Sequence, residues 1–247
     1  MRRVYPAISI VGGIALWWVL ALIPAFSKVL PTPIAVLQAV PQQLHAGLGT
    51  NIGMSLMRVG IGFAIALVLA VPIGFLMGWY RWAQGLLEPW IQFFRTVPPI
   101  ALIPMVVIIF GIGESAKIFV IWTAAFLTIV ISVYQGVKNV DTTLLKAARV
   151  LGANDFNLFW DVVIPASFPY ILVGVRLGLA SAWSTLVAAE LIASQHGLGS
   201  MIEQAGLYYQ VSVIVMGIFI IGIIGFLMDR GVLWMERRLT RWQETLK

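Results

Sequence analysis

Two ionisable residues lie inside long apolar stretches of the sequence and are the first candidates for chemistry. Glu190 follows the run WSTLVAA, and Arg58 lies within MSLMRVGIGF. A charge inside an apolar span is costly, and it commonly marks a solute pathway, a proton relay or an internal ion pair. For Glu190 an interfacial position satisfied by water is an equal alternative, and for Arg58 we favour snorkelling or internal pairing. Both residues are therefore pathway candidates.

The sequence contains no pair of residues suited to catalysis or metal binding. It has no Cys, which excludes disulfides and thiol chemistry, and its two histidines, His45 and His196, lie far apart in the sequence. An enzyme acting inside a membrane would need a nucleophile with a base, or a set of metal ligands, within its spans. The glycine-rich pattern that binds ATP phosphates is also absent. We therefore expect no enzyme activity, no metal and no cofactor bound by this chain.

A proline-rich stretch supplies further pathway candidates. FFRTVPPIALIPMVVIIF contains Pro98, Pro99 and Pro104 within an apolar segment. Each proline removes a backbone donor, and broken backbone is tolerated at membrane depth only where protein or a water-filled cavity satisfies the freed groups. The stretch therefore lines a pathway or forms a simple kink, and the residues leave both alternatives open.

The longest segment of mixed polarity between two apolar spans is KAARVLGANDFNLFWDVVIP, residues 146–165. A short helix is predicted to start just before this segment and to continue into it, because apolar residues recur at helical spacing: Leu144, Leu145, Ala148 and Leu151. Asp141 or Thr142 is suited to cap the start of this helix. Gly152 stands where the end of a helix favours a residue with positive φ. The segment is therefore expected to break at Gly152.

A second short helix is predicted after this break. Asn154 and Asp155 supply an N-cap and negative charge at the positive helix end. Four apolar residues follow at positions i, i+3, i+4 and i+7: Phe156, Phe159, Trp160 and Val163. Pro165 is expected to end the helix. Such an apolar face suits either a partner protein or the membrane surface.

Residues 146–165 resemble the cytoplasmic EAA loop of permeases from ABC importers. The family pattern is Glu-Ala-Ala, three residues, Gly, nine residues and Ile-x-Leu-Pro. Here Lys146-Ala147-Ala148, Gly152 and Val162-x-Ile164-Pro165 keep that spacing, with Lys146 where the family often has Glu. The resemblance implies that the loop couples the permease to its ATPase. The implied coupling residues are Lys146, Ala147, Ala148, Gly152, Asp155, Phe156, Phe159, Trp160 and Pro165.

The composition predicts an all-α polytopic membrane protein with a single domain over residues 1–247. Of its residues 60% are hydrophobic and only 11% are charged, against about a quarter in soluble domains. Spans of about 20 residues cross an apolar layer of about 30 Å. Six are predicted, at residues 6–26, 54–78, 88–110, 117–136, 169–192 and 211–234. The first span resembles a signal peptide, but its length and the lack of a clear cleavage site predict that it is retained.

The positions of the basic residues predict the orientation. Six spans place both termini on one side, and eleven basic residues fall on that side: Arg2, Arg3, Arg81, Lys138, Lys146, Arg149, Arg230, Arg237, Arg238, Arg241 and Lys247. Only Lys28 and Lys117 fall clearly on the other side. The positive-inside rule therefore predicts that both termini and the 137–168 loop are cytoplasmic. Trp234 with the basic tail is expected to contact anionic lipid. This topology explains the net charge of +6 without a nucleic-acid partner.

Further segments resemble the nitrate, sulfonate and taurine branch of these permeases. They are RTVPPIALIP, FGIGESAK, GVK and GLG, with WSTLVAAELI most similar to taurine permeases. The resemblance implies a type I importer fold with six spans in a bacterial inner membrane. It also implies a homodimer, two ATPase subunits that bind ATP and Mg, and a solute-binding protein. The implied solute is taurine or a related alkanesulfonate.

Two alternatives remain at this stage. Other members of the branch transport nitrate, other small anions or heterocyclic vitamin precursors, so the solute is open. A stand-alone carrier driven by ions is a different class of protein. Such carriers commonly show internal repeats and paired broken helices, whereas this sequence has one strongly broken segment and no repeat.

Overall fold

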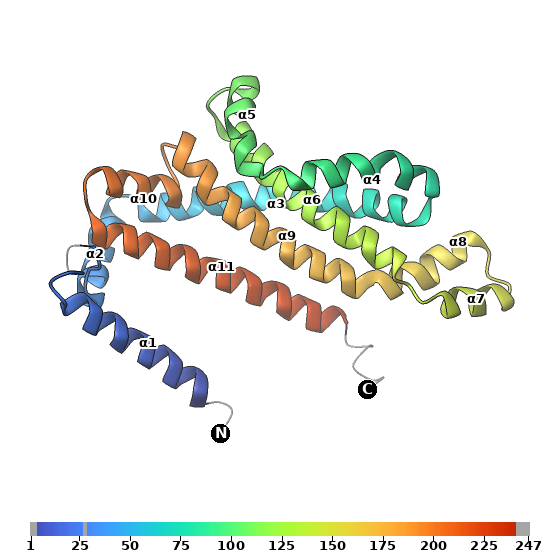
Figure 1. The fold of residues 1–247 in the computed structure, drawn as a ribbon, viewed down its shortest axis with the longest axis horizontal. Coiled ribbons are helices and arrows are strands. Elements are labelled where there is room, and N and C mark those ends of the chain that lie inside the picture. Colours follow the sequence, from blue (N-terminus) through green and yellow to red (C-terminus); the bar gives the residue numbers. More distant parts are fainter. Residues whose placement is uncertain (1–3, 27–28, 241–247) are drawn as a thin grey trace. The chain divides into compact units, whose positions relative to one another are not determined.

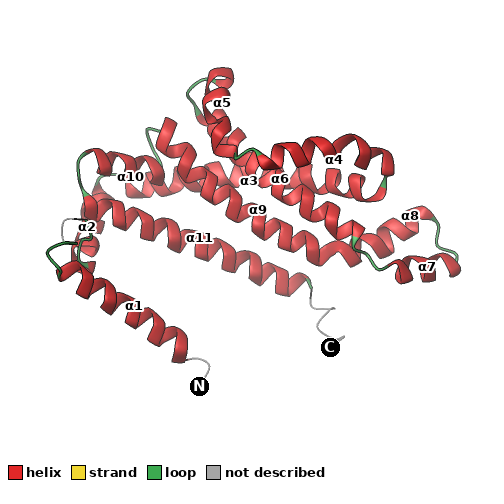
Figure 2. Ribbon diagram, in the orientation of Figure 1, coloured by secondary structure: helices red, strands yellow, loops and turns green. Residues whose placement is uncertain are grey.

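A computed structural model describes residues 4–26 and 29–240 of the chain. Every regular element in these ranges is helical, which confirms the all-α prediction (Figure 2). The chain divides into two compact units, Met1–Ser55 with Glu190–Ile224 (unit 1) and Leu56–Ala189 with Gly225–Lys247 (unit 2). Several basic residues used to predict the orientation lie outside the described residues: Arg2, Arg3, Lys28, Arg241 and Lys247.

The helices are labelled in Figure 1. In chain order they are α1 (Val4–Leu22), α2 (Pro33–His45), α3 (Leu48–Trp79), α4 (Arg81–Thr96), the 3₁₀ turn η1 (Pro99–Leu102), α5 (Ile103–Phe110), α6 (Glu114–Lys138), α7 (Thr142–Val150), α8 (Asp155–Asn157), the π-helical turn η2 (Leu158–Val163), α9 (Ile164–Ala193), α10 (Leu198–Leu207) and α11 (Val211–Leu239). The predicted spans 54–78, 117–136, 169–192 and 211–234 lie within α3, α6, α9 and α11.

Helix α6 forms the core of unit 2. In its most apolar stretch 61% of the residues are buried, against 28% for α3, 33% for the helix containing α9 and 17% for α11. A helix that is apolar on all sides requires protein around it. The burial of α6 therefore agrees with a helix that packs inside the protein.

Small residues bring α3 and α9 close to α6. On α3, a Cβ added at Gly74 would lie 2.6 Å from Val133 Cβ of α6, and Gly78 faces Val137 one turn further on. On α9, Gly174 faces Ser132 and Gly178 faces Ile129. In lipid, helices associate through close backbone approach of this kind. The Gly74-x-x-x-Gly78 pair therefore serves packing inside the subunit.

The proline-rich segment is broken, as its sequence predicted. Helices α4 and η1–α5 meet at a bend of 90° that follows Thr96. Pro98 precedes η1, Pro99 begins it, and Pro104 lies in the first turn of α5, where a missing N–H leaves no hydrogen bond unmade. Ile103 and Val106 of α5 pack on Ala116 and Val120 of α6. The predicted span 88–110 is therefore two helices held at an angle.

Length and composition give a lower number of spans than predicted. Among the described residues four helices are long and apolar enough to cross a membrane, and the bent pair of α4 with η1–α5 would make five. The apolar part of α1 is Ile8–Leu22, which is shorter than the other spans. The count of six stays a prediction.

Unit 1 contains α1, α2, α10 and parts of three long helices. The Nε1 atom of Trp17 donates to the carbonyl oxygen of Pro31 at 3.0 Å, and its ring stacks on Phe219 at 5.1 Å. Between the first two predicted spans, residues Pro33–His45 form helix α2. Helix α10 lies between the predicted spans 169–192 and 211–234, where no helix was predicted.

We predict that Gly74→Ala destabilises the protein. The added methyl group would press on Val133 between two closely packed helices, and overpacking of this kind costs about 1–3 kcal/mol. The measurement is the thermal unfolding midpoint in detergent, with Gly60→Ala as the matched control, because a Cβ there meets no atom within 4 Å. Equal midpoints for the two variants would contradict the proposed packing.

Candidate functional site

Helix α7 is held by caps at both ends. The carboxylate of Asp141 accepts from the backbone N–H of Thr143 at 2.7 Å, and this hydrogen bond holds the pKa of Asp141 below its usual value. Gly152 has a φ of +87°, and its N–H donates to the Arg149 carbonyl while that of Ala153 donates to Ala148. These two bonds form a Schellman motif. The prediction for Gly152 is therefore confirmed.

The chain then enters α9 without a break. Asn154 caps α8 by accepting from the N–H of Asn157 at 2.8 Å, and η2 joins α8 to α9. The prediction that Pro165 ends this helix is wrong, because Pro165 lies in the first turn of α9. The π-helical turn explains why the proline is tolerated. The N–H of Ile164 donates to the carbonyl of Phe159, five residues back, so the backbone hydrogen bonds already depart from the α-helical pattern where Pro165 lacks a donor.

The predicted apolar face of the second helix is split in two. Phe159 lies against Phe75 and Trp79 of α3, with ring centroids 5.6 and 5.4 Å apart. Val163 is buried among the same group of residues. Phe156 and Trp160 are instead 69% and 54% exposed. The outward apolar surface of this helix therefore consists of Phe156 and Trp160.

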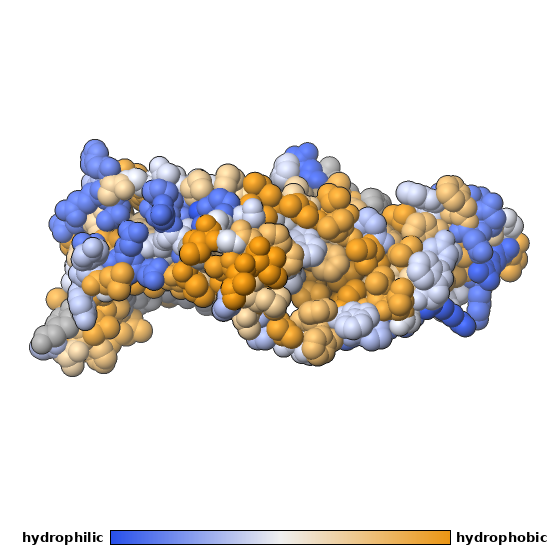
Figure 3. Space-filling view, turned by 90° about the horizontal axis from the view of Figure 1, so that it is seen from above, coloured by the Kyte–Doolittle hydropathy of each residue, from blue (hydrophilic) through white to orange (hydrophobic). Residues whose placement is uncertain are grey.

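The exposed surface of α7 and α8 combines apolar and charged groups. Its exposed apolar residues are Leu144, Val150, Leu151, Phe156 and Trp160. Lys146 and Ala147 are exposed and Ala148 is half-buried. Asp155 forms an exposed ion pair with Arg149 at 3.4 Å across the Gly152 turn. Figure 3 shows mainly hydrophilic surface over this end of unit 2, with hydrophobic atoms among it. Together α7, α8 and the start of η2 therefore present a surface that combines apolar and charged side chains.

Arg58 is buried in an internal ion pair, the alternative that the sequence analysis favoured. Its Nε and one terminal nitrogen donate to Glu114 at 2.5 and 2.8 Å, and the side chain is 1% exposed. Lys117 also donates to Glu114, at 3.0 Å. Glu114 lies between the predicted spans 88–110 and 117–136 and was not among the predicted site residues; it begins α6 and binds two cations.

Glu190 is fully buried in unit 1, not at a wet interface. Its carboxylate accepts from the hydroxyl of Ser55 at 2.8 and 3.0 Å and from the N–H of Gly199 at 2.9 Å. The Ser55 hydroxyl also accepts from the N–H of Leu198. Glu190 therefore supplies negative charge to the N-terminus of α10, where unpaired N–H groups favour an anion.

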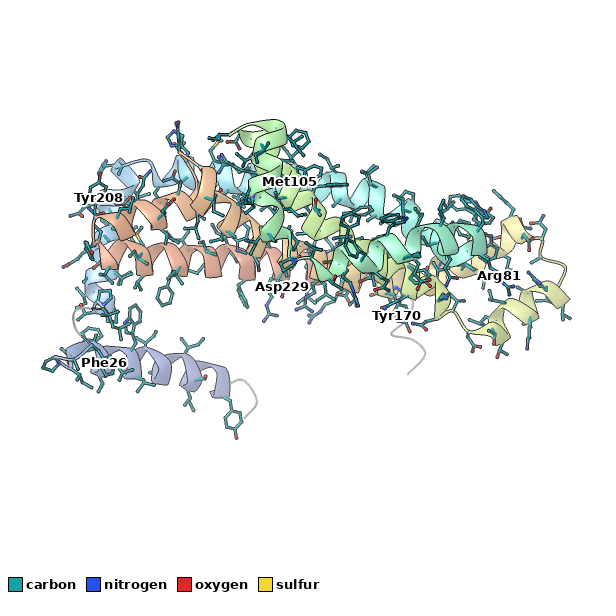
Figure 4. The ribbon with its side chains drawn as sticks, turned by 45° about the horizontal axis from the view of Figure 1, so that its top comes forward. Phe26, Arg81, Met105, Tyr170, Tyr208 and Asp229 are labelled. Carbon is teal, nitrogen blue, oxygen red and sulfur yellow. The ribbon has the colours of Figure 1, made fainter. Side chains whose placement is uncertain are left out.

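A further ion pair was missed by the sequence analysis. Arg176 of α9 donates from Nε and a terminal nitrogen to the two carboxylate oxygens of Asp229 on α11, the second bond at 2.9 Å (Figure 4 labels Asp229). The pair borders a cavity of about 180 Å³. Asp229 lies inside the predicted span 211–234, so its position in an apolar helix was a signal that could have found it.

The described residues contain no group of three or more His, Asp or Glu side chains that could hold a metal ion. Within the described residues these charges instead form separate clusters, around Glu114, around Glu190 and between Arg176 and Asp229. The structure does not bring Pro98, Pro99 and Pro104 to any of these clusters through a described contact.

We predict that Glu190→Ala destabilises unit 1. The change leaves the Gly199 N–H without its acceptor in a buried site, which costs about 1–3 kcal/mol of unfolding free energy. Glu190→Gln keeps an acceptor oxygen and should cost less. The measurement is the thermal midpoint in detergent, with exposed Glu203→Ala on α10 as the control. Equal midpoints for the two Ala variants would contradict this role, and loss of transport in Glu190→Gln at an unchanged midpoint would indicate a pathway role.

The family of the chain follows from comparison with known proteins. Residues 70–241 match the model of the family described as "Binding-protein-dependent transport system inner membrane component". A probable ABC transporter permease protein of Brucella abortus (strain 2308) is 53% identical over 238 residues, covering 96% of this chain and 94% of the relative. The taurine transport system permease protein TauC of Escherichia coli (strain K12) is 40% identical over 236 residues, covering 93% and 86%.

Solved structures show the same fold. An inward-facing structure of the MetNI methionine ABC transporter matches with a TM-score of 0.70 at 21% identity, over 80% of this chain and 98% of that one. At this identity the likeness concerns the fold alone. With the family match over residues 70–241 and relatives among the taurine, sulfonate and nitrate permeases, the chain belongs to the binding-protein-dependent inner-membrane permeases of ABC importers.

Proposed function

We propose that residues 1–247 form one permease domain that translocates taurine or a related alkanesulfonate. A solute-binding protein delivers the solute from outside, and two copies of the chain form the pathway. Each copy docks one ATPase subunit, which binds ATP and Mg. The 40% identity to TauC over most of both chains supports this solute class. Nitrate, another small anion or a heterocyclic vitamin precursor remains the alternative solute, and no observation favours a stand-alone carrier.

The observation that supports ATPase coupling most directly is the exposed apolar surface of α7 and α8. Phe156 and Trp160 lie side by side with ring centroids 6.1 Å apart, and Leu151 nearby in sequence is 88% exposed. Arg149 and Asp155 add charge beside them. Large apolar groups exposed among charges are typical of a binding surface for another protein. We therefore assign this surface to the ATPase.

The rest of the loop holds this surface in place. Phe159 and Val163 fix η2 to Phe75 and Trp79 of α3 and to Val137 of α6. Gly152 sets the angle between α7 and α8 through its positive φ. A movement of the ATPase would therefore be passed to the spans through packed side chains. Pro165 lies at the start of α9, directly after this fixed turn.

We predict that Phe156→Asp or Trp160→Asp abolishes ATP turnover stimulated by binding protein and solute. Truncation of one buried interface aromatic costs about 2 kcal/mol or more, which is about a thirtyfold loss of ATPase affinity. The measurement is ATPase activity of the complex reconstituted in vesicles. Phe159→Ala is the matched control: its ring packs inside the subunit, so it should lower the thermal midpoint. Normal stimulation in both Asp variants would show that this loop is not the coupling element.

Gly152→Val tests the turn rather than the contact surface. A β-branched residue resists positive φ, so the angle between α7 and α8 should change. We expect reduced stimulation of ATP turnover while Phe156 and Trp160 are unchanged. Lys146→Glu, which introduces the residue common in the family at an exposed position, should have a mild effect in the same assay.

The positions of the basic residues support cytoplasmic termini and a cytoplasmic 137–168 loop. Because the chain has no Cys, single cysteines at exposed Asn154 and exposed Gln195 report the orientation without background. An impermeant thiol reagent applied to intact cells should label Gln195→Cys and leave Asn154→Cys unlabelled. Labelling at 154 alone would invert the orientation.

A further inference from the structure

The cavity beside Arg176 and Asp229 is bounded by two opposite charges inside apolar helices. Both residues lie in unit 2, Arg176 on α9 and Asp229 on α11. Charged side chains within spans almost always face the interior of the protein or a water-filled cavity. Here the cavity has a volume of about 180 Å³. The pair therefore lies at one side of a recess whose other walls are mostly apolar.

Neither side chain of the ion pair is fully buried. The side chains of Arg176 and Asp229 are 42% and 35% exposed, so water or a solute can reach both. A guanidinium has five N–H donors and a carboxylate about four acceptor sites. Their two mutual hydrogen bonds use only part of this capacity. Each charge can therefore bind a further group of opposite sign.

The remaining walls suit a small solute with a short apolar middle. Ser184 adds a hydroxyl two turns along α9 from Arg176, and buried Trp183 adds an aromatic wall. Trp183 packs closely on Gly225 of α11, because a Cβ at Gly225 would lie 2.9 Å from Trp183 Nε1. One water occupies about 30 Å³ in the liquid, so the cavity has room for about six waters or a molecule of a few heavy atoms.

We propose that this cavity is an intramembrane binding site for a small zwitterion. The anionic group of the solute binds Arg176 and the Ser184 hydroxyl, and its ammonium group binds Asp229. The connecting methylene groups lie along Trp183. The proposal rests on the proposed function, because it assigns a stopping place to the solute that the permease translocates. It favours solutes with both charges over simple anions, since a simple anion leaves Asp229 without a new partner.

The test measures protection of a single cysteine in the cavity. Ser184→Cys is introduced into the permease–ATPase complex, and its alkylation rate by N-ethylmaleimide is measured without binding protein. Taurine at millimolar concentration should slow the reaction severalfold, and ethanesulfonate or ethylamine at the same concentration should slow it much less. Adding Asp229→Asn should weaken the apparent affinity for taurine about tenfold, because one charge-assisted contact is lost.

Two further variants guard against misinterpretation. Ala180→Cys lines the same cavity and should show the same protection if Ser184→Cys does not assemble. Leu177→Cys lies on the same helix, is exposed and is outside the cavity lining, so taurine should not protect it.

An alkylation rate that none of the three compounds changes would overturn the proposal. Equal protection by all three compounds, with no effect of Asp229→Asn, would overturn it as well. In either case Arg176 and Asp229 would form a packing ion pair only. Solute uptake into vesicles containing the unmodified complex, binding protein and ATP is measured in parallel. Uptake without protection refutes the intramembrane site alone, whereas absence of uptake for all tested solutes refutes the proposed function.

Discussion

The close contact of α6 with the glycine-bearing faces of α3 and α9 is the constraint on which unit 2 depends. In lipid there is little hydrophobic gain from bringing two apolar helices together, so association relies on contact at short range. Gly74 of α3 and Gly178 of α9 allow this contact with α6. The positions of Arg58, Glu114 and Arg176 all follow from it, because these residues lie on the three packed helices.

The 137–168 loop is held by local capping interactions and by one tertiary contact. Asp141, Gly152 and Asn154 define where its short helices begin and end. Phe159 then fixes the loop to α3. The caps and the Phe159 contact use other side chains, so the neighbouring Phe156 stays exposed. The arrangement separates the residues that hold the loop from those that present its surface.

Much of this architecture could be predicted from the sequence, and the failures have a common cause. Local signals gave the Gly152 turn and the proline break, since both depend on the conformational limits of single residues. The sequence did not show that Phe159 turns inward, because the π-helical turn changes which residues share a face. The ion pairs of Arg58 with Glu114 and Arg176 with Asp229 join residues 56 and 53 positions apart, a distance that helical periodicity cannot bridge.

The π-helical turn between α8 and α9 also has a consequence for how motion is shared. An extra residue in one turn rotates everything before it by about 100° around the helix axis, given about 3.6 residues per turn. Phe156 therefore points to a side of the helix different from the one an uninterrupted α-helix would give it. A push on this side acts off the axis of α9 and twists the helix as well as tilting it. Pro165, directly after the wide turn, lacks the N–H that a regular α-helix would use there, which favours the wide turn over a regular α-helix.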